Sequence, residues 1–223
     1  MKIIHIITGL NDGGAEAVLY RLCKFDKSNN HQIISLSNLG KYGLMLKTLG
    51  LKVDTCNMLP GRFSLISFLR LIRLLQKEMP DIVQTWMYHG DFIGGLAARI
   101  SGIRAIVWGI HHTTLDPKNS KKTTILIAKL SAKLSSFIPE KIIVCSKRGI
   151  DVHKKLGYDS KKMYFVPNGY DLNDFQPSAF SKTQLKSQLG LEHSTPLIGS
   201  VGRFDPQKDQ KNLLEALQIL TKK

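Results

Sequence analysis

The sequence predicts an α/β fold in which a parallel sheet carries helices on both faces, followed by the first βα unit of a second domain. Short apolar runs rich in β-branched residues alternate with longer amphipathic stretches. Gly, Pro and Asn bound the short runs, as is typical of strands that alternate with helices. This alternation predicts βαβ units, whose right-handed crossovers place helices on both faces of a sheet.

Taken in order, the expected strands of the first domain are residues 3–8, 32–37, 81–85, 105–110 and 141–145. The expected helices lie near residues 16–24, 44–49, 65–77, 91–100, 123–137 and 149–156. The turn-rich segment 165–177 can continue neither a helix nor a central strand, so the first domain is predicted to end at about residue 177. A linking helix at 181–189 and a strand at 195–201 then open the second domain, residues 178–223.

The composition is that of a globular chain, because 43% of the 223 residues are hydrophobic and can form a core. Three cysteines without a CxxC spacing favour reduced, buried thiols in a cytoplasmic protein. No apolar run is long enough for a transmembrane helix. The net charge of +15 favours an anionic partner, such as nucleic acid, anionic lipid or a phosphorylated substrate. A solvated basic surface is the equally weighted alternative.

The first candidate site follows the first strand, where three glycines fall within residues 9–14. Gly13 and Gly14 precede a helix start, so backbone N–H groups there can approach a phosphate closely. Glu16 follows in the first helical turn. The spacing is not GxGxxG, so a nicotinamide or flavin site is not supported. A tight βα turn without a ligand is the alternative.

Histidines follow two consecutive strands of the predicted sheet. His89 lies in the segment 85–91, and His111 and His112 lie in the segment 108–114. Ligands of parallel sheets bind at the carboxyl ends of the strands, and a histidine there can act as a base or bind an oxyanion. A single histidine is more often structural, but two clusters favour function. No acidic residue lies at a typical ligand spacing from the pair, so no metal site is predicted.

Two further segments have a functional and a structural interpretation. Ser146 follows the strand 141–145 and precedes two basic residues at a helix start, which suits a phosphate or sugar hydroxyl as well as a plain N-cap. The helix 65–77 separates basic from apolar residues. Such a helix either lies on an anionic membrane or, as the favoured interpretation, covers the sheet while its arginines extend to solvent.

The segment VGRFDPQKD at residues 201–209 combines a strand end, a turn and a helix start. Arg203 follows a glycine, and Lys208 follows a Pro-Gln turn just before a helix-periodic stretch. Two cations beside a helix N-terminus suit a diphosphate. The segment therefore predicts a phosphate-binding turn.

Together these motifs resemble glycosyltransferase family 4, retaining enzymes of the GT-B fold that use nucleotide-sugar donors. The motifs occur in the family's order over nearly the whole chain: GGAE, IIVCSKRGIDVHKKLGY, VPNGYDLNDFQP and VGRFDPQKD. The resemblance implies two Rossmann-like domains. The amino-terminal domain mostly handles the acceptor, and the carboxy-terminal domain mostly binds the nucleotide sugar.

The resemblance also implies roles for single residues. Arg203 and Lys208 match the donor diphosphate contacts, and Gly13 and Gly14 match the loop beside the donor phosphates. His111 matches the family's cleft histidine near the transferred sugar, with His112 as the competing assignment. The remaining expected acceptor-side or cleft residues are Glu16, His89, Ser146, Asn168 and Gly169. The donor is a nucleotide-sugar substrate, and neither cofactor nor metal is implied.

One departure concerns the donor side. The family's two Glu residues, eight positions apart, would lie beyond residue 223, so the isolated chain is expected to show little or no transferase activity. The expected function is the acceptor-binding part of a glycosyltransferase for bacterial surface polysaccharide, with a glycan or lipid-diphosphate-linked acceptor. An anionic membrane surface, at the inner face of the cell membrane, is a further candidate partner.

Two other functions remain open at this stage. A nucleotide-sugar epimerase or hydrolase on the same fold would need carboxylates that activate water at the cleft, and the sequence shows no clear pair. A non-enzymatic anion- or nucleic-acid-binding domain is suggested by charge alone. No zinc spacing or aromatic-basic interleaving supports it, so nucleic acid is not an expected partner.

Overall fold

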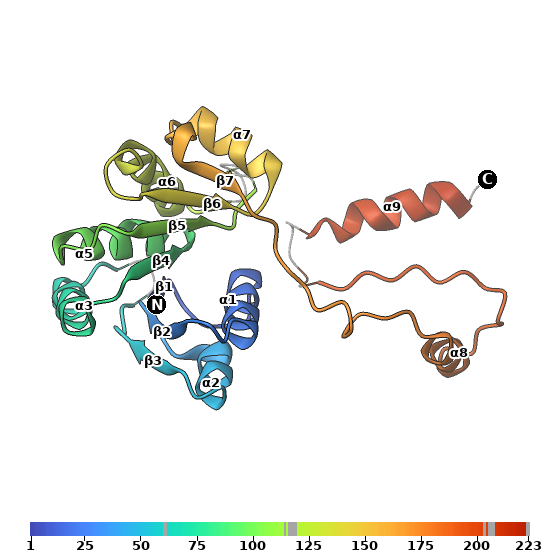
Figure 1. The fold of residues 1–223 in the computed structure, drawn as a ribbon. Helices are drawn as coiled ribbons and strands as arrows, with labels where there is room; N and C mark the ends of the chain where they lie inside the picture. The colour runs from blue at the N-terminus through green and yellow to red at the C-terminus, as the bar shows by residue number, and fades with distance from the viewer. Residues whose placement is uncertain (60–61, 114, 116–119, 203, 205–207, 222–223) are drawn as a thin grey trace. The chain divides into compact units, whose positions relative to one another are not determined.

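The computed structural model describes residues 1–223 except 60–61, 114, 116–119, 203, 205–207 and 222–223. The described chain divides into two compact units, Met1–Gly169 and Tyr170–Lys223. The division falls after Gly169, whereas the domain boundary was expected at about residue 177. The first unit holds a seven-stranded parallel sheet with the strand order β3-β2-β1-β4-β5-β6-β7. This is a Rossmann-like α/β fold (Figure 1).

The strands are β1 (Lys2–Ile7), β2 (Asn30–Ser35), β3 (Lys52–Thr55), β4 (Ile82–Trp86), β5 (Ile106–Ile110), β6 (Lys141–Val144) and β7 (Met163–Phe165). The helices of the first unit are α1 (Gly14–Phe25), α2 (Gly40–Thr48), α3 (Leu65–Glu78), α4 (Met87–His89), the π-helical turn η1 (Gly90–Gly94), α5 (Gly95–Ile100), α6 (Lys122–Leu134), α7 (Lys147–Leu156) and the 3₁₀ turn η2 (Ser160–Lys162). The second unit contains α8 (Ala179–Gln188) and α9 (Gln210–Thr221).

The sheet has an apolar core on each face because successive side chains of a strand point to opposite sides. Ile4 and Ile6 of β1 join the cluster that includes residues of α3, α5 and α6. Ile7 of β1 and Ile33 of β2 join a second cluster with Leu19 of α1 and residues of α2. Figure 1 shows α3, α5 and α6 along one face and α1 and α2 along the other. The central strands are therefore buried on both sides.

The strand order reverses at β1. The chain runs outward from β1 to β2 and β3, and then returns to β4 on the other side of β1. The loops that leave β1 and β4 therefore diverge, and such a point in an open parallel sheet is where ligands bind, beyond the carboxyl ends of the strands. The candidate residues of the first unit that follow β1 and β4 lie on these loops.

Two glycines allow the segment after β4 to pack directly on the sheet. A Cβ at Gly94 would lie 2.8 Å from Cγ2 of Ile6, and a Cβ at Gly95 would lie 2.6 Å from Nε1 of Trp108. Any larger residue would push η1 and α5 away from β1 and β5. Short π-helical segments such as η1 occur frequently at functional sites.

The five strands expected in the first domain are confirmed, with shifts of one or two residues at their ends. The edge strands β3 and β7 were not predicted, because they are short and only partly buried and so lack a continuous apolar run. The prediction of a strand at residues 195–201 was wrong, because no strand is formed there. A strand needs a partner for its backbone hydrogen bonds, and the described part of the second unit contains no other strand.

The expected helices are confirmed, including the linking helix and the one after residue 209. The single helix expected at 91–100 is instead the series α4, η1 and α5, which begins four residues earlier. All three cysteines are free; Cys23 and Cys56 are buried, and Cys145 is half-buried. Among the described residues, no helix is both long and apolar enough to cross a membrane.

Candidate active site at the carboxyl edge of the sheet

The turn after β1 leads into α1 through the predicted glycines. Gly13 is the N-cap of α1 and offers no side chain as a cap, while Gly14 is the first helical residue. A Cβ at Gly13 would lie 2.3 Å from Oε2 of Glu16, whereas a Cβ at Gly14 would meet nothing within 4 Å. The Glu16 carboxylate therefore lies over the helix N-terminus at Gly13, and open space lies at Gly14. An anion that approached this turn would have to reach Gly14 or displace Glu16.

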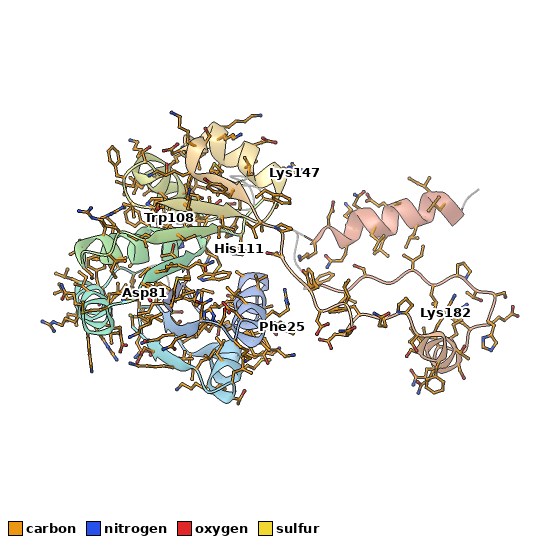
Figure 2. The ribbon with its side chains drawn as sticks, in the orientation of Figure 1. Phe25, Asp81, Trp108, His111, Lys147 and Lys182 are labelled. Carbon is orange, nitrogen blue, oxygen red and sulfur yellow. The ribbon has the colours of Figure 1, made fainter. Side chains whose placement is uncertain are left out.

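His111, labelled in Figure 2, directly follows β5. An aromatic stack holds its ring. Its ring lies parallel to that of Trp86, at the end of β4, with ring centroids 5.0 Å apart and planes at 13°. Burial and, after it, the neighbouring His112 lower the pKa of His111 to about 4. His111 is therefore a neutral imidazole at neutral pH, with one nitrogen to donate and one to accept.

A buried hydrogen bond fixes the position of Trp86. Its Nε1 donates to Nδ1 of His5 at 3.2 Å, and Nε2 of His5 lies 2.9 Å from Nδ1 of His31. Because an indole can only donate, Nδ1 of His5 must accept, and the proton of His5 sits on Nε2. Burial lowers the pKa of His5 to about 3, so this imidazole is neutral. Nε2 of His5 therefore donates to His31.

His112 is held by a second stack. Its ring lies 4.8 Å from that of Tyr88 at 21°. The Tyr88 hydroxyl lies 2.6 Å from Nε2 of His153, and Nδ1 of His153 lies 2.6 Å from the Gly149 carbonyl. A carbonyl can only accept, so Nδ1 of His153 donates to it and the Tyr88 hydroxyl donates to Nε2. Burial, followed by the charge of His89, lowers the pKa of His112.

His89 ends the short helix α4 and is half-buried. Burial, followed by the charge of Lys121, lowers its pKa. The helix begins at Met87, which has a φ of 65°, a left-handed conformation that is uncommon for a residue with a side chain. Uncommon backbone conformations of this kind concentrate at functional sites. The sharp turn at Met87 places His89 at the same edge as His112.

The buried carboxyl of Asp91 connects β4 and β5 and is not one of the candidate site residues at the edge of the sheet. Its Oδ1 accepts from the Thr85 hydroxyl at 2.5 Å and from the Gly109 N–H at 3.2 Å. Burial raises the pKa of Asp91 to about 8, because the two hydrogen bonds offset only part of the cost of burying its charge. Asp91 is thus mostly protonated at neutral pH and is not an ionised base.

The structure places the other predicted site residues as follows. Ser146 is the N-cap of α7, and its Oγ accepts from the Gly149 N–H at 2.9 Å, which is the structural role left open above. Asn168 and Gly169 are exposed at the end of the first unit, where the Gly169 carbonyl accepts from Nε of Arg21. Lys208 is exposed in the second unit, and Arg203 lies outside the described residues. Within the first unit, the structure thus groups His89 and His112 with His111 at one edge of the sheet.

Among the residues that the structure describes, one buried cluster has atoms that could bind a metal. Ring nitrogens of His5 and His31 and Sγ of Cys23 all lie within 4.8 Å of one another. Binding a metal here would require His5 to lose the Nε2 proton that it donates to His31. It would also require the Cys23 thiolate, although burial raises the pKa of this thiol to about 12. The donor set therefore favours a neutral hydrogen-bonded cluster over a metal site.

The sequence did not identify the residues that hold the two histidines. His5 and Trp86 come from β1 and β4, and His153 comes from α7, so their contacts join segments 65 or more residues apart. His5 lies in an apolar strand and carries no local signal of its own. Two of these residues, Trp86 and Tyr88, lie in the aromatic segment 85–91 that was noted for its histidine, and His153 lies within the motif at residues 142–158.

Comparisons with known proteins agree on the fold. The chain is 31% identical over 162 residues to an Escherichia coli UDP-Gal:α-D-GlcNAc-diphosphoundecaprenol α-1,3-galactosyltransferase, covering 69% of this chain and 40% of that protein. It is 26% identical over 153 residues to a D-inositol 3-phosphate glycosyltransferase of Xylanimonas cellulosilytica, covering 63% of this chain and 36% of that one. The crystal structure of Anabaena HepE with UDP superposes with a TM-score of 0.81 at 20% identity, covering 97% of this chain and 57% of HepE.

The chain therefore spans roughly a third to a little over half the length of these relatives. The sequence model of the family described as Glycosyltransferase Family 4 matches residues 12–174, which is most of the first unit and includes the glycine turn and the three edge histidines. A match over more than half of the chain shows the family as well as the fold. The chain belongs to glycosyltransferase family 4.

Proposed function

We propose that this chain forms the acceptor side of a retaining glycosyltransferase that moves a sugar from a nucleotide-sugar donor to a lipid-diphosphate-linked or glycan acceptor. The observation that carries the proposal is the gathering of His89, His111 and His112 at the carboxyl edge of the sheet, the edge at which the glycine turn leads from β1 into α1. The E. coli relative is named for a lipid-diphosphate acceptor, and HepE was crystallised with UDP. Assembly of bacterial surface polysaccharide is the process that we propose for it.

Neutral imidazoles suit an acceptor sugar. A neutral histidine can donate one hydrogen bond and accept another, so it can bind a sugar hydroxyl in either direction. The stacks on Trp86 and Tyr88 hold the rings of His111 and His112 before any ligand arrives, which lowers the entropy cost of binding. We assign His111 to the place where the transferred sugar meets the acceptor sugar that receives it, so that it contacts both, with His112 as the alternative.

The donor side requires cations, because negative charge develops on the diphosphate as the sugar leaves. We assign this role to Arg203 and Lys208, together with the backbone N–H groups at Gly13 and Gly14. No metal ion or other cofactor is part of the proposal, since these groups neutralise the leaving diphosphate. Gly14 has the open space that a phosphate needs for close approach.

Binding to the 223-residue chain tests the acceptor assignment. A glycosyl diphosphate with a short alkyl group should bind more tightly than inorganic diphosphate, as measured by calorimetry. His111→Ala should remove about tenfold of this advantage, the value of a lost hydrogen bond to a sugar hydroxyl, and leave the affinity for inorganic diphosphate unchanged. His193→Ala, an exposed histidine of the second unit, is the control. Equal binding of the two diphosphates by the unaltered chain would refute the acceptor role.

We also propose that the protein is cytoplasmic and binds the inner face of the cell membrane peripherally. The first turns of α3 expose Leu65, Ile66 and Leu69, and Arg70 and Arg73 follow on the same helix. Each surface cation adds about 1 kcal/mol of attraction to an anionic bilayer. Sedimentation with vesicles should therefore show binding to anionic phosphatidylglycerol vesicles that salt weakens. Equal binding to neutral phosphatidylcholine vesicles would contradict this part of the proposal.

A further inference from the structure

A cavity of about 310 Å³ opens at the carboxyl edge of the sheet, on the face covered by α3, η1 and α6. Its walls come from the ends of β1, β2 and β3, from the segment before α3, and from α4, η1 and α6. The lining residues are Thr8, Leu36, Ser37, Met58, Leu59, Arg62, Phe63, His89, Phe92, Ile93, Thr123, Leu126 and Ile127. Of these, only His89 belongs to the candidate site described above.

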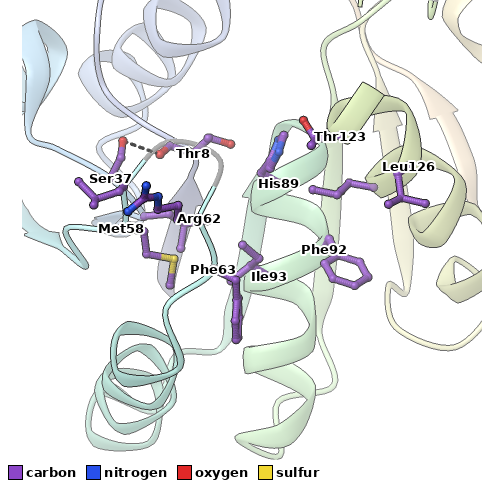
Figure 3. A pocket seen from close by; sticks show the side chains of 13 residues that line it. Thr8, Ser37, Met58, Arg62, Phe63, His89, Phe92, Ile93, Thr123 and Leu126 are labelled. Carbon is purple, nitrogen blue, oxygen red and sulfur yellow. Dashed lines mark hydrogen bonds between the residues drawn. The ribbon is translucent and has the colours of Figure 1, made fainter. Parts of the chain in front are cut away.

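The cavity changes in character along its length. Figure 3 shows Thr8, His89 and Thr123 near one end, and the rings of Phe63 and Phe92 with Ile93 toward the other. The polar end is formed by residues that follow β1 and β4, where the acceptor head is expected. The apolar end extends between α3 and η1. A ligand with a polar head and an apolar tail matches this arrangement.

The polar end also favours an anion. Arg62 lines the cavity, and Lys121, the residue before α6, is close enough to His89 to lower its pKa, although burial is the larger cause. No Asp or Glu occurs among the described residues that line the cavity. A diphosphate near this end would meet cations and no competing carboxylate, which favours its binding.

The apolar end is open to the surface. Three of its lining side chains are largely exposed: Leu59 at 63%, Phe63 at 64% and Leu126 at 58%. Ile66, one turn further along α3, is 83% exposed. Large apolar side chains gathered around a cavity indicate a binding surface more than scattered single ones do. A chain that leaves the cavity would therefore continue over apolar surface.

We propose that this cavity binds the polyprenyl chain of a lipid-diphosphate acceptor, at the isoprene units next to the diphosphate. The inference rests on the proposed function and adds a site for the lipid, formed mainly by Phe63, Phe92, Ile93 and Leu126. Its volume lies at the small end of the range for ligand pockets, so it holds the first units and leaves the rest of the chain outside. The diphosphate then lies between Arg62 and His89, with the sugar toward the edge histidines.

Three soluble probes separate the head from the tail: farnesyl diphosphate, inorganic diphosphate and farnesol, each titrated into the 223-residue chain. Farnesyl diphosphate should bind at least about tenfold more tightly than inorganic diphosphate, because burying even a few methylene groups supplies that factor. It should also bind more tightly than farnesol. Equal affinity for the two diphosphates would overturn the proposal.

A matched pair of substitutions on α6 locates the tail. Leu126→Trp fills the cavity from a position that is mostly exposed, so the fold should tolerate it. Leu130→Trp, one turn later and also partly exposed, lies outside the lining and is the control. Leu126→Trp should remove most of the tail's advantage and leave inorganic diphosphate binding unchanged, whereas Leu130→Trp should match the unaltered chain. The same loss in both variants would show a non-specific apolar surface and overturn the site.

Arg62→Gln tests the head separately. It should weaken inorganic and farnesyl diphosphate by the same factor and so preserve the tail's advantage. Thermal unfolding of each variant verifies that the fold is retained. The outcome is independent of the acceptor test above: a glycosyl group that adds affinity while the farnesyl chain adds none would leave the proposed function standing and reject the lipid site. If the farnesyl chain adds affinity and the glycosyl group adds none, the lipid site stands and the proposed acceptor function is rejected.

Discussion

At the scale of single residues, the position of His111 depends on side chains that it does not touch. Trp86 stacks on His111, and His5 accepts the hydrogen bond that fixes Trp86. His31 in turn lies within hydrogen-bond distance of His5, and its Nε2 is 3.2 Å from Oδ2 of Asp26, although not in hydrogen-bond geometry. The hydrogen bonds run in one direction, from Trp86 to His5 and from His5 to His31, because the indole of Trp86 can only donate. This order needs no charged imidazole in the core.

We expect Trp86→Phe to show the value of that hydrogen bond. The phenyl ring can still stack on His111, but Nδ1 of His5 would be left buried without a donor, which costs about 1–3 kcal/mol. Trp108→Phe is the control, since Trp108 is equally buried and its Nε1 has no partner within the described residues. The free energy of unfolding, measured with urea, should fall by about 1 kcal/mol more in Trp86→Phe. Equal losses would show that the hydrogen bond contributes nothing.

At the scale of secondary structure, the segment from α4 to α5 positions the site. Gly94 and Gly95 have no side chains and so let this segment pack closely against β1 and β5. Asp91 within η1 accepts hydrogen bonds from Thr85 of β4 and from the backbone of β5. A carboxyl in this position costs stability when it ionises. Since its folded pKa of about 8 lies above its ordinary value of 3.8, the folded state holds a proton that the unfolded chain releases between these values. The free energy of unfolding therefore falls as pH rises across this range.

Asp91→Asn should remove this pH dependence, because the amide keeps the shape and cannot ionise. Relative to the unaltered chain, the variant should gain a few kcal/mol in the free energy of unfolding between pH 4 and pH 8. Urea unfolding at several pH values measures the difference. Asp151→Asn, on the exposed side of α7, should follow the unaltered chain. A parallel pH profile for Asp91→Asn would refute the buried protonated carboxyl.

At the scale of the whole molecule, the two units differ in their cores. Among the described residues, every large apolar side chain that is buried lies before residue 170. In the second unit, by contrast, Phe180, Ile198, Phe204 and Leu214 are exposed. An element without a buried apolar face gains little from folding to offset its conformational entropy. The second unit should therefore open far more readily than the first.

Limited proteolysis should show this difference directly. A low concentration of proteinase K is expected to degrade residues 178–223 first and leave a resistant fragment that ends between residues 170 and 177. Mass spectrometry of the products identifies that end. Initial cleavage within Met1–Gly169, or equal resistance of both units, would contradict the expectation.

The sequence alone determined the class of fold, because the periods of apolar residues report which segments are buried on both sides. It also indicated the edge histidines, since parallel strands bring their carboxyl ends together. Ser146 shows the limit of such reasoning: a hydroxyl at a helix start is compatible with a ligand or a cap, and only the structure shows that Ser146 caps α7 through Gly149.

Only the tertiary structure decided what surrounds the site. The stacks on Trp86 and Tyr88, the hydrogen bonds of His5 and His153, and the cavity beside His89 join segments that are distant in the chain. Local patterns carry no information on such pairings, because the side chains meet only after strand order and register are set. For the same reason the strand expected at 195–201 is not formed. Its sequence favours an extended chain, but a strand exists only where a neighbouring strand completes its hydrogen bonds.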